Sequence, residues 1–133
     1  AGEAPTADTA VYLGDTMGEM AAFYSAIPIT FLAGSLVPVG GHNPIEPAHC
    51  GTALLLGPLM PNNRDAADML IAAGAARPVA DGDRLADAVE ALLAAPPEAA
   101  AMADRGQVVA GDGRAGLARI LDALTPLLPG ASG

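Results

Sequence analysis

The pattern of apolar positions divides this chain into short hydrophobic runs separated by segments with helical spacing. Runs of consecutive apolar residues predict buried strands, and apolar residues that recur every three or four positions predict amphipathic helices. The predicted strands are 10–13, 29–33, 52–56 and 76–79, and the predicted helices are about 17–26, 44–50, 63–73, 83–93, 97–109 and 114–127. Strands that are apolar throughout and alternate with helices indicate an α/β fold, with a parallel, Rossmann-like sheet and flanking helices on both faces.

Three loops of unusual composition fall at one edge of the predicted sheet. They are residues 14–19, 34–46 (the glycine loop) and 57–64, and each follows the carboxyl end of a predicted strand. In parallel α/β sheets, ligands bind in the crevice outside the carboxyl ends of the strands. Because nearly all of the unusual polar residues lie in these three loops, we expect the binding site at this edge.

The glycine loop leads from a strand through a glycine-rich turn to the start of a helix. Gly34, Gly40 and Gly41 allow positive φ angles and a close approach of the backbone to a ligand. Asn43 suits the N-cap of the following helix, and Pro44 suits its first position. Free amides at a helix N-terminus, together with its partial positive charge, bind anions such as phosphate.

Side chains of the glycine loop add candidate ligand contacts. Ser35, His42 and Asn43 can donate hydrogen bonds, and Glu46, in the first helical turn, can accept them from ligand hydroxyls. This set favours a phosphate or sugar cradle. The alternative is an ordinary connection rich in glycine and proline, although a loop of this length and composition after a buried strand usually has a function.

The other two loops supply weaker candidates. Asp15, Thr16 and Glu19 can line a ligand cleft, or they can provide a helix cap and an acidic first turn. Asn62 and Arg64 can contact an anionic ligand, or they can form a capped helix start with a solvated arginine. The residues by themselves leave both alternatives open.

Composition narrows the classes of function. The net charge is −9 at pH 7 and the six Lys+Arg residues are all arginine, which argues against nucleic-acid binding and against electrostatic attachment to anionic lipid. Cys50 is the one cysteine, and the two histidines lack paired spacing, so neither a disulfide nor a metal site is indicated. No Walker or dinucleotide-binding motif, nucleophile–base pair or bilayer-spanning apolar run is present, so we expect no cofactor and no catalytic residue in this chain.

Three motifs together resemble one enzyme family. Residues 14–19 read GDTMGE, residues 34–47 read GSLVPVGGHNPIEP, and residues 57–58 read GP. In this order and with this spacing they closely resemble the C-terminal part of bacterial 3-deoxy-D-manno-octulosonic acid (Kdo) transferases. The resemblance covers about residues 11–124 and the combination of motifs is highly specific.

The resemblance implies a function for the parent protein. Kdo transferases are inverting glycosyltransferases of the two-domain GT-B architecture, and they move Kdo from CMP-Kdo onto the lipid A precursor at the cytoplasmic face of the Gram-negative inner membrane. Their C-terminal domain binds the donor, whereas the N-terminal domain carries the acceptor site, the membrane anchor and the general base. By this resemblance no metal is required.

The same resemblance assigns roles to residues of the three loops. The backbone of Gly34, Ser35 and residues 40–43 is expected to cradle the CMP phosphate, and Glu46 to bind ribose or sugar hydroxyls. The candidates in residues 14–19 would line the donor cleft. Residues 61–64 depart from the aromatic-rich stretch that the family usually has there, which leaves the roles of Asn62 and Arg64 open.

The length of the chain adds three expectations. Residues 1–133 would form a single, partial C-terminal domain without the N-terminal acceptor domain. One edge of its sheet would be unpaired or covered by another chain, for example in a homo-oligomer. The isolated chain would be soluble and would not catalyse transfer.

Two other functions remain open from the sequence. One is a transferase or epimerase of the same fold that acts on a UDP- or GDP-sugar. The other is a non-catalytic domain that binds a nucleotide or a partner protein through the same edge.

Overall fold

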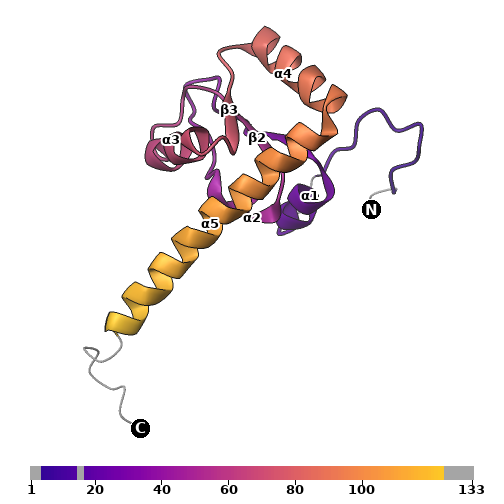
Figure 1. Ribbon diagram of the computed structural model, residues 1–133. Helices are drawn as coiled ribbons and strands as arrows, with labels where there is room; N and C mark the ends of the chain where they lie inside the picture. Colours follow the sequence, from indigo (N-terminus) through magenta and orange to yellow (C-terminus); the bar gives the residue numbers. More distant parts are fainter. Residues whose placement is uncertain (1–3, 15–16, 125–133) are drawn as a thin grey trace.

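A three-stranded parallel sheet lies at the centre of the computed structural model (Figure 1). The structure describes residues 4–14 and 17–124, with side chains described as far as residue 112. The elements in chain order are α1 (Met20–Ala26), β1 (Ile29–Phe31), α2 (Ile45–Cys50), β2 (Ala53–Leu56), α3 (Arg64–Ala72), β3 (Ala76–Pro78), α4 (Gly82–Ala94) and α5 (Pro96–Leu124).

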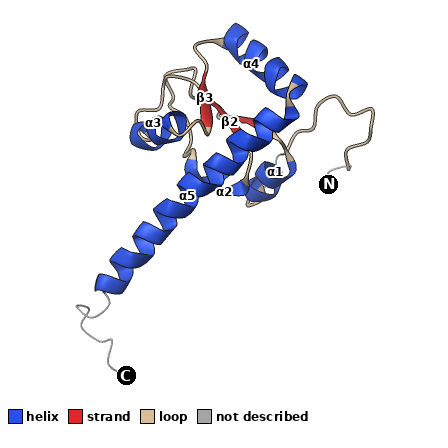
Figure 2. Cartoon of the chain, in the orientation of Figure 1, coloured by secondary structure: helices blue, strands red, loops and turns tan. Residues whose placement is uncertain are grey.

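The strands lie in the order β1-β2-β3, with β2 in the middle. Ile29 is in register with Ala53, and Leu54 with Ala76, and both pairs of strands are parallel. All four residues of β2 are buried. Helices surround the strands (Figure 2), so the predicted α/β class, with a parallel sheet and flanking helices, is confirmed.

Alternate residues of β2 belong to two separate hydrophobic clusters. Leu54 and Leu56 lie in a cluster that includes residues of α2 and α3, whereas Ala53 and Leu55 lie in a cluster that includes residues of α4 and the first turns of α5. Because successive side chains of a strand point to opposite faces, the sheet is covered on both sides. A strand buried in this way reads in the sequence as a continuous apolar run.

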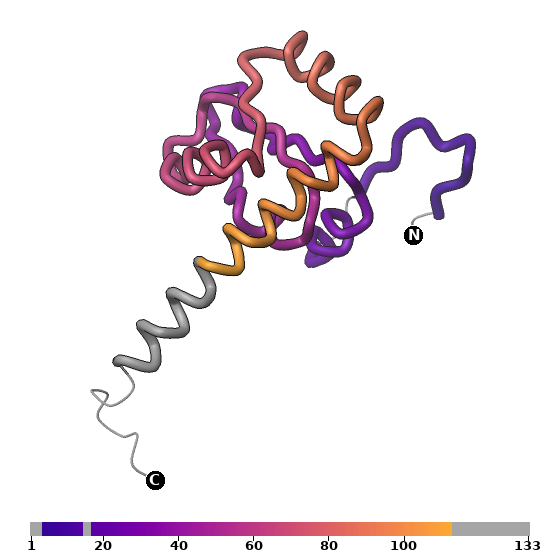
Figure 3. Tube along the Cα trace, in the orientation of Figure 1, coloured from indigo at the N-terminus to yellow at the C-terminus, as the bar shows by residue number. Residues whose placement is uncertain are grey.

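Local signals set several of the helix ends. Gly51 adopts the left-handed conformation (φ +83°) and terminates α2, as expected for a C-terminal glycine. Asp81 caps α4 by accepting a hydrogen bond of 2.8 Å from the amide of Arg84. The connection from α4 into α5 can be followed in the tube of Figure 3.

The predicted strand at 10–13 is wrong. These residues form no strand, and Val11, Tyr12 and Leu13 are 86%, 49% and 80% exposed. An extended apolar segment becomes a strand only when a neighbour pairs with its backbone. Among the described residues no strand does so, since the sheet consists of β1, β2 and β3.

Two helix predictions also need correction. The first helix begins at Met20 with Glu19 at the N-cap position, so it is shorter than predicted. The residues expected to cap it, Asp15 and Thr16, lie outside the described part of the chain. The two helices expected at 97–109 and 114–127 are one continuous helix, α5. A glycine such as Gly111 costs a helix only about 1 kcal/mol, so it weakens a helix without breaking it.

Two neighbouring leucines of α4 give a matched test of this packing. Leu92 is 1% exposed and belongs to the second cluster, whereas Leu93 is 61% exposed. We expect Leu92→Ala to lower the free energy of unfolding by about 2–5 kcal/mol through lost burial and cavity formation. Leu93→Ala makes the same change in helix propensity but removes no buried side chain. It should therefore lower the free energy of unfolding by only about 0.5 kcal/mol. Urea unfolding monitored by circular dichroism measures both, and equal losses would contradict the packing described.

Candidate functional site

Ser35 connects the exits of two adjacent strands. Its side chain is completely buried, and its hydroxyl donates to the carbonyl of Leu32 (2.5 Å), just after β1, and accepts from the amide of Gly57 (2.8 Å), just after β2. A hydroxyl has one proton to donate, so this one is used within the protein. The expectation that the Ser35 hydroxyl donates to a ligand is therefore corrected: it holds the loop.

Glycine is required where the glycine loop folds against itself. Gly34 has φ +83°, and a Cβ there would lie 2.5 Å from the carbonyl oxygen of Gly40. A Cβ on Gly41 would lie 2.0 Å from the sulfur of Met60, and one on Gly57 would lie 2.3 Å from the carbonyl oxygen of Ser35. At Gly34 and Gly57 the close atoms are backbone, so a side chain there would require the backbone to move; at Gly41 a side chain would require the Met60 side chain to move.

The glycine loop is bonded to the loop that follows β2. The amide of Leu59 donates to the carbonyl of Ser35 (2.9 Å), and the amide of Gly41 donates to the carbonyl of Leu59 (3.0 Å). The side-chain amide of Asn63 donates to the carbonyl of Gly41 (3.2 Å). Two of the three predicted loops are thus brought together. The contact of Asn63 with Gly41 has no local signal in the sequence, since the two residues lie 22 positions apart.

Because of these bonds, fewer backbone amides of the glycine loop are available to a ligand than the sequence predicted. The amides of Gly40 and Gly41 donate within the protein, to Val37 (3.4 Å) and Leu59. They are therefore not the free donors that the sequence predicted. In the described part of the chain, the amides of Gly34, His42 and Asn43 make no hydrogen bond within the protein.

The start of α2 provides the other polar groups of the site. Pro44 occupies the N-cap position, and the side-chain oxygen of Asn43 accepts a 3.0 Å hydrogen bond from the amide of Ile45. The predicted positions are therefore corrected by one residue: Pro44 and not Asn43 is the N-cap, and the Asn43 side chain bonds only the amide of Ile45. Glu46 lies in the first turn and is exposed, as are His42 and Asn43.

Tyr24 is a residue near this site that the sequence suggested only as core. It is the buried residue of α1, 9% exposed. Burial raises the pKa of its phenol above the usual value, and the charges of Glu46 and Cys50 on α2 raise it further. A charge acts on the phenol only from nearby, so α1 and α2 bring Tyr24 close to Glu46.

A cavity of about 550 Å³ lies beside these residues, between α1 and β1. Its polar lining includes Tyr24, Thr30 and His42. Thr30 is engaged with Thr52 through a 3.0 Å hydroxyl–hydroxyl hydrogen bond. His42 thus lies at the junction of the glycine loop and this cavity.

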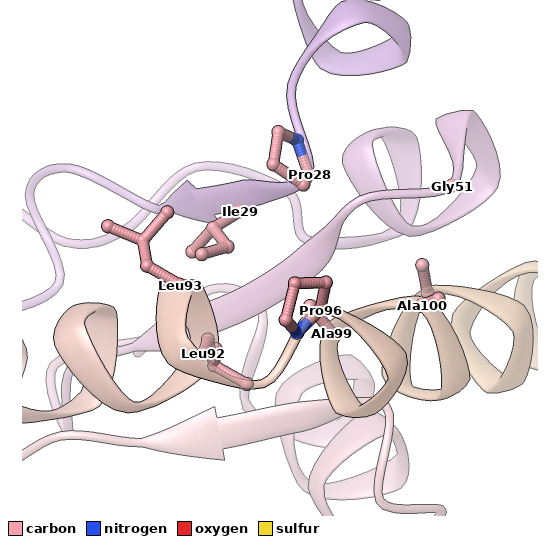
Figure 4. Close-up of a pocket in the computed structure, with 9 residues that line it drawn as sticks. Pro28, Ile29, Gly51, Leu92, Leu93, Pro96, Ala99 and Ala100 are labelled. Atoms are coloured by element: carbon pink, nitrogen blue, oxygen red, sulfur yellow. The ribbon is translucent and has the colours of Figure 1, made fainter.

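A second cavity lies at the amino ends of the strands, at the opposite end of the sheet from the glycine loop. It measures about 250 Å³ and is enclosed by Pro28, Ile29, Gly51, Leu92 and Pro96, with small residues of α5 (Figure 4). It has an apolar wall and adjoins the amino ends of β1 and β2, away from the glycine loop. We therefore place the candidate site at the carboxyl ends of the strands.

The remaining candidates lie at the surface. Asn62 and Arg64 are exposed near the start of α3, beyond the loop that contacts the glycine loop. Glu19 is exposed at the start of α1. Asp15 and Thr16 cannot be placed, since they lie outside the described residues.

Three other arginines are already engaged. Arg77 forms an ion pair with Glu98, Arg84 forms one with Asp87 (2.9 Å), and Arg105 donates to the carbonyl of Gly74 (2.8 Å). No comparable partner of Arg64 is present among the described residues. Arg64 is therefore the described arginine best placed to meet an anion at this edge.

Two kinds of site are absent from the described part of the chain. No three His, Cys, Asp or Glu side chains gather closely enough to hold a metal ion. No described helix has both the length and the apolar character needed to cross a bilayer.

Curated relatives align with most of the length of this chain. The chain is 37% identical over 127 residues to the 3-deoxy-D-manno-octulosonic acid transferase of Haemophilus influenzae, which covers 95% of this chain and 30% of that protein. It is 39% identical over 114 residues to the enzyme of the same name from Bordetella pertussis, covering 86% of this chain and 27% of that protein. The chain thus spans less than a third of these relatives. No family model matches it.

A solved structure shares the fold. The crystal structure of the C-terminal CMP-Kdo binding domain of WaaA from Acinetobacter baumannii superposes with a TM-score of 0.71 at 32% identity. The match covers 76% of this chain and 53% of that one. The resemblance noted from the motifs is therefore confirmed by sequence and by structure.

Two glycines with similar backbone angles test the closed form of the loop. Gly34 and Gly18 have φ of +83° and +86°, but a Cβ on Gly18 would meet no described atom within 4 Å. Gly18→Ala should cost about 1 kcal/mol for its left-handed backbone. Gly34→Ala adds the clash with Gly40 and should cost more than about 2 kcal/mol. Chemical denaturation measures both, and a Gly34→Ala loss no larger than that of Gly18→Ala would contradict the described contact.

The raised pKa of Tyr24 predicts a loss of stability at high pH. The folded state holds the phenol proton more tightly than the unfolded state, so this contribution is complete below the unfolded pKa of about 10 and is lost as pH rises through the folded value. Tyr24→Phe should therefore reduce the fall in unfolding free energy above pH 10. The control is Tyr12→Phe, at a half-exposed ring. An alkaline fall unchanged by Tyr24→Phe would refute the assignment.

Proposed function

We propose that this chain, a homologue of the C-terminal part of Kdo transferases, holds the CMP-Kdo donor at the glycine loop. One observation carries the proposal: the Ser35 hydroxyl and the close glycine contacts fix this loop at the carboxyl ends of β1 and β2, with the amides of Gly34, His42 and Asn43 bonded to no acceptor among the described residues. Fixed amides bind an anion without the cost of ordering a flexible segment. The name of the Acinetobacter domain supports CMP-Kdo as the ligand.

In this proposal each polar group of the site contacts a particular part of the donor. The unpaired amides bind the phosphate of CMP, and Arg64 adds a positive charge from the neighbouring loop. Glu46 accepts hydrogen bonds from ribose or sugar hydroxyls, and His42 contacts the donor at the mouth of the cavity. Glu19, with Asp15 and Thr16, lines the donor cleft.

The parent reaction is a direct displacement at the anomeric carbon of Kdo, with inversion. The bond from this carbon to the CMP phosphate breaks as the acceptor oxygen attacks, so negative charge grows on the leaving phosphate. Fixed amides near that phosphate stabilise the charge without reorganising. The general base, the lipid A precursor site and the membrane attachment at the cytoplasmic face of the inner membrane belong to the N-terminal domain of the parent enzyme. The chain alone therefore binds donor and does not turn over.

Calorimetric titration of this chain with CMP tests the proposal. CMP should bind more tightly than UMP, which differs in the base alone, and more tightly than UDP. Glu46→Ala should weaken CMP binding by roughly tenfold or more, as expected when a hydrogen bond to a charged group is lost. The matched control is Glu90→Ala, an exposed carboxylate on α4, which should leave the affinity unchanged.

Two results would argue against this assignment. Equal affinity for CMP, UMP and UDP would favour a less selective nucleotide site. Full CMP affinity in Glu46→Ala would place the ligand elsewhere on the domain.

A further inference from the structure

The donor of the proposed function carries two negative groups on one carbon. Kdo is a 2-keto sugar acid, so in CMP-Kdo the anomeric carbon bears both the phosphate oxygen and a carboxylate, and both groups are ionised at neutral pH. If backbone amides of the glycine loop bind the phosphate, the carboxylate needs a partner of its own. The chain has a net charge of −9, which favours a positive group at the site as this partner.

Arg64 is the described arginine available for this role. It is exposed, and no ion pair joins its guanidinium to a carboxylate of the described residues. Asp65 and Asp68, which follow it on α3, are also exposed and make no ion pair with it. A guanidinium that is already paired must break that pair before it binds a ligand, and Arg64 has no such pair among the described residues.

The start of α3 is fixed beside the glycine loop. Asn63 occupies the N-cap position of α3, but its side chain makes no cap bond there and donates instead to the carbonyl of Gly41 (3.2 Å). The amide of Asn63 donates to the carbonyl of Met60 (3.1 Å), and the sulfur of Met60, a buried residue, packs against Gly41. The backbone of Arg64, the next residue, is thereby held in place relative to the glycine loop, and only its side chain remains to be ordered by a ligand.

The phosphate and the carboxylate of one donor must bind to neighbouring segments, because they share a carbon atom. His42 and Asn43, whose amides have no acceptor among the described residues, follow Gly41, and Arg64 follows Asn63. The bond between Gly41 and Asn63 therefore joins the segment assigned to the phosphate to the segment that carries the arginine. The flexible stem of an arginine side chain gives its guanidinium room to approach a group bound at the loop.

The chemistry of arginine suits a sugar acid better than a neutral sugar. Its planar guanidinium binds a carboxylate through two parallel hydrogen bonds, which provide both affinity and orientation. A hydroxyl at the same place carries no charge and cannot form this paired contact. Building on the proposed function, we propose that Arg64 binds the carboxylate of the donor sugar and so selects an acidic sugar nucleotide over a neutral one.

A cycle of two ligands and two proteins tests this contact. The ligands are CMP-Kdo and its carboxylate methyl ester, which lacks the negative charge, and the proteins are the chain and its Arg64→Gln variant, each titrated by calorimetry. The chain should bind CMP-Kdo at least roughly tenfold more tightly than the ester, as expected for a hydrogen-bonded pair of charges. In Arg64→Gln this preference should disappear, and the variant should weaken binding of CMP-Kdo more than binding of CMP, which has no carboxylate.

Two further variants separate the contact from the effect of charge alone. Arg84→Gln removes the same charge from an exposed arginine in the first turn of α4, and it should leave the preference for CMP-Kdo over the ester unchanged. Arg64→Lys keeps the charge but loses the planar pair of donors, so it should retain only part of the preference.

Other results would overturn this proposal. Equal binding of CMP-Kdo and its ester by the chain, or a preference that survives in Arg64→Gln, would show that Arg64 does not bind the carboxylate. Equal weakening of CMP and CMP-Kdo by Arg64→Gln would place the guanidinium on the phosphate, and equal effects of Arg64→Gln and Arg84→Gln would reduce its role to general attraction. In each of these cases CMP still binds and Glu46→Ala still weakens it, so the donor proposal survives, whereas a chain that binds no CMP would refute both.

Discussion

The buried hydroxyl of Ser35 is the interaction on which the geometry of the candidate site depends. It donates to Leu32 and accepts from Gly57, and so ties the exit of β1 to the exit of β2. A buried amide left without a partner costs about 1–3 kcal/mol, which is a large share of the stability of a small domain. The backbone bond from Leu59 to Ser35 acts between the same two segments. Together these bonds fix one loop relative to the other before any ligand arrives.

If the glycine loop holds the donor as we propose, this constraint gives an acidic chain a means of binding an anion. The net charge is −9, and three of the six arginines are engaged far from the glycine loop. Under the proposed function, attraction therefore has to come from backbone amides whose direction is set by the fold, with Arg64 as an exposed positive charge at the start of α3. The glycines serve this purpose indirectly. They let the backbone at Gly34, Gly41 and Gly57 approach neighbouring atoms, and the amides of His42 and Asn43 have no acceptor among the described residues.

The middle strand β2 and the outer strand β1 differ in how fully they are paired and buried. β2 is paired along both edges and buried on both faces, so its backbone and its side chains are all satisfied within the chain. Among the described residues β1 has no neighbouring strand on one edge, and the cavity, the exposed Val11 and Leu13, and the shortened α1 all lie on that side. The donor site we propose adjoins this boundary, since His42 lines the same cavity.

The sequence by itself determined the features that depend on local chemistry. The continuous apolar run of β2, the glycine that ends α2, the aspartate that caps α4 and the motifs shared with the Kdo transferases could all be recognised from neighbouring residues. Partners distant in the chain decided the rest. Residues 10–13 have the composition of a strand but pair with no strand in the described part of the chain, and the amides of Gly40 and Gly41 are used by acceptors that no local pattern reveals. Tyr24 looks like core in the sequence, and only the approach of α2 gives it Glu46 as a neighbour, because a hydrogen bond or a charge effect depends on distance in space.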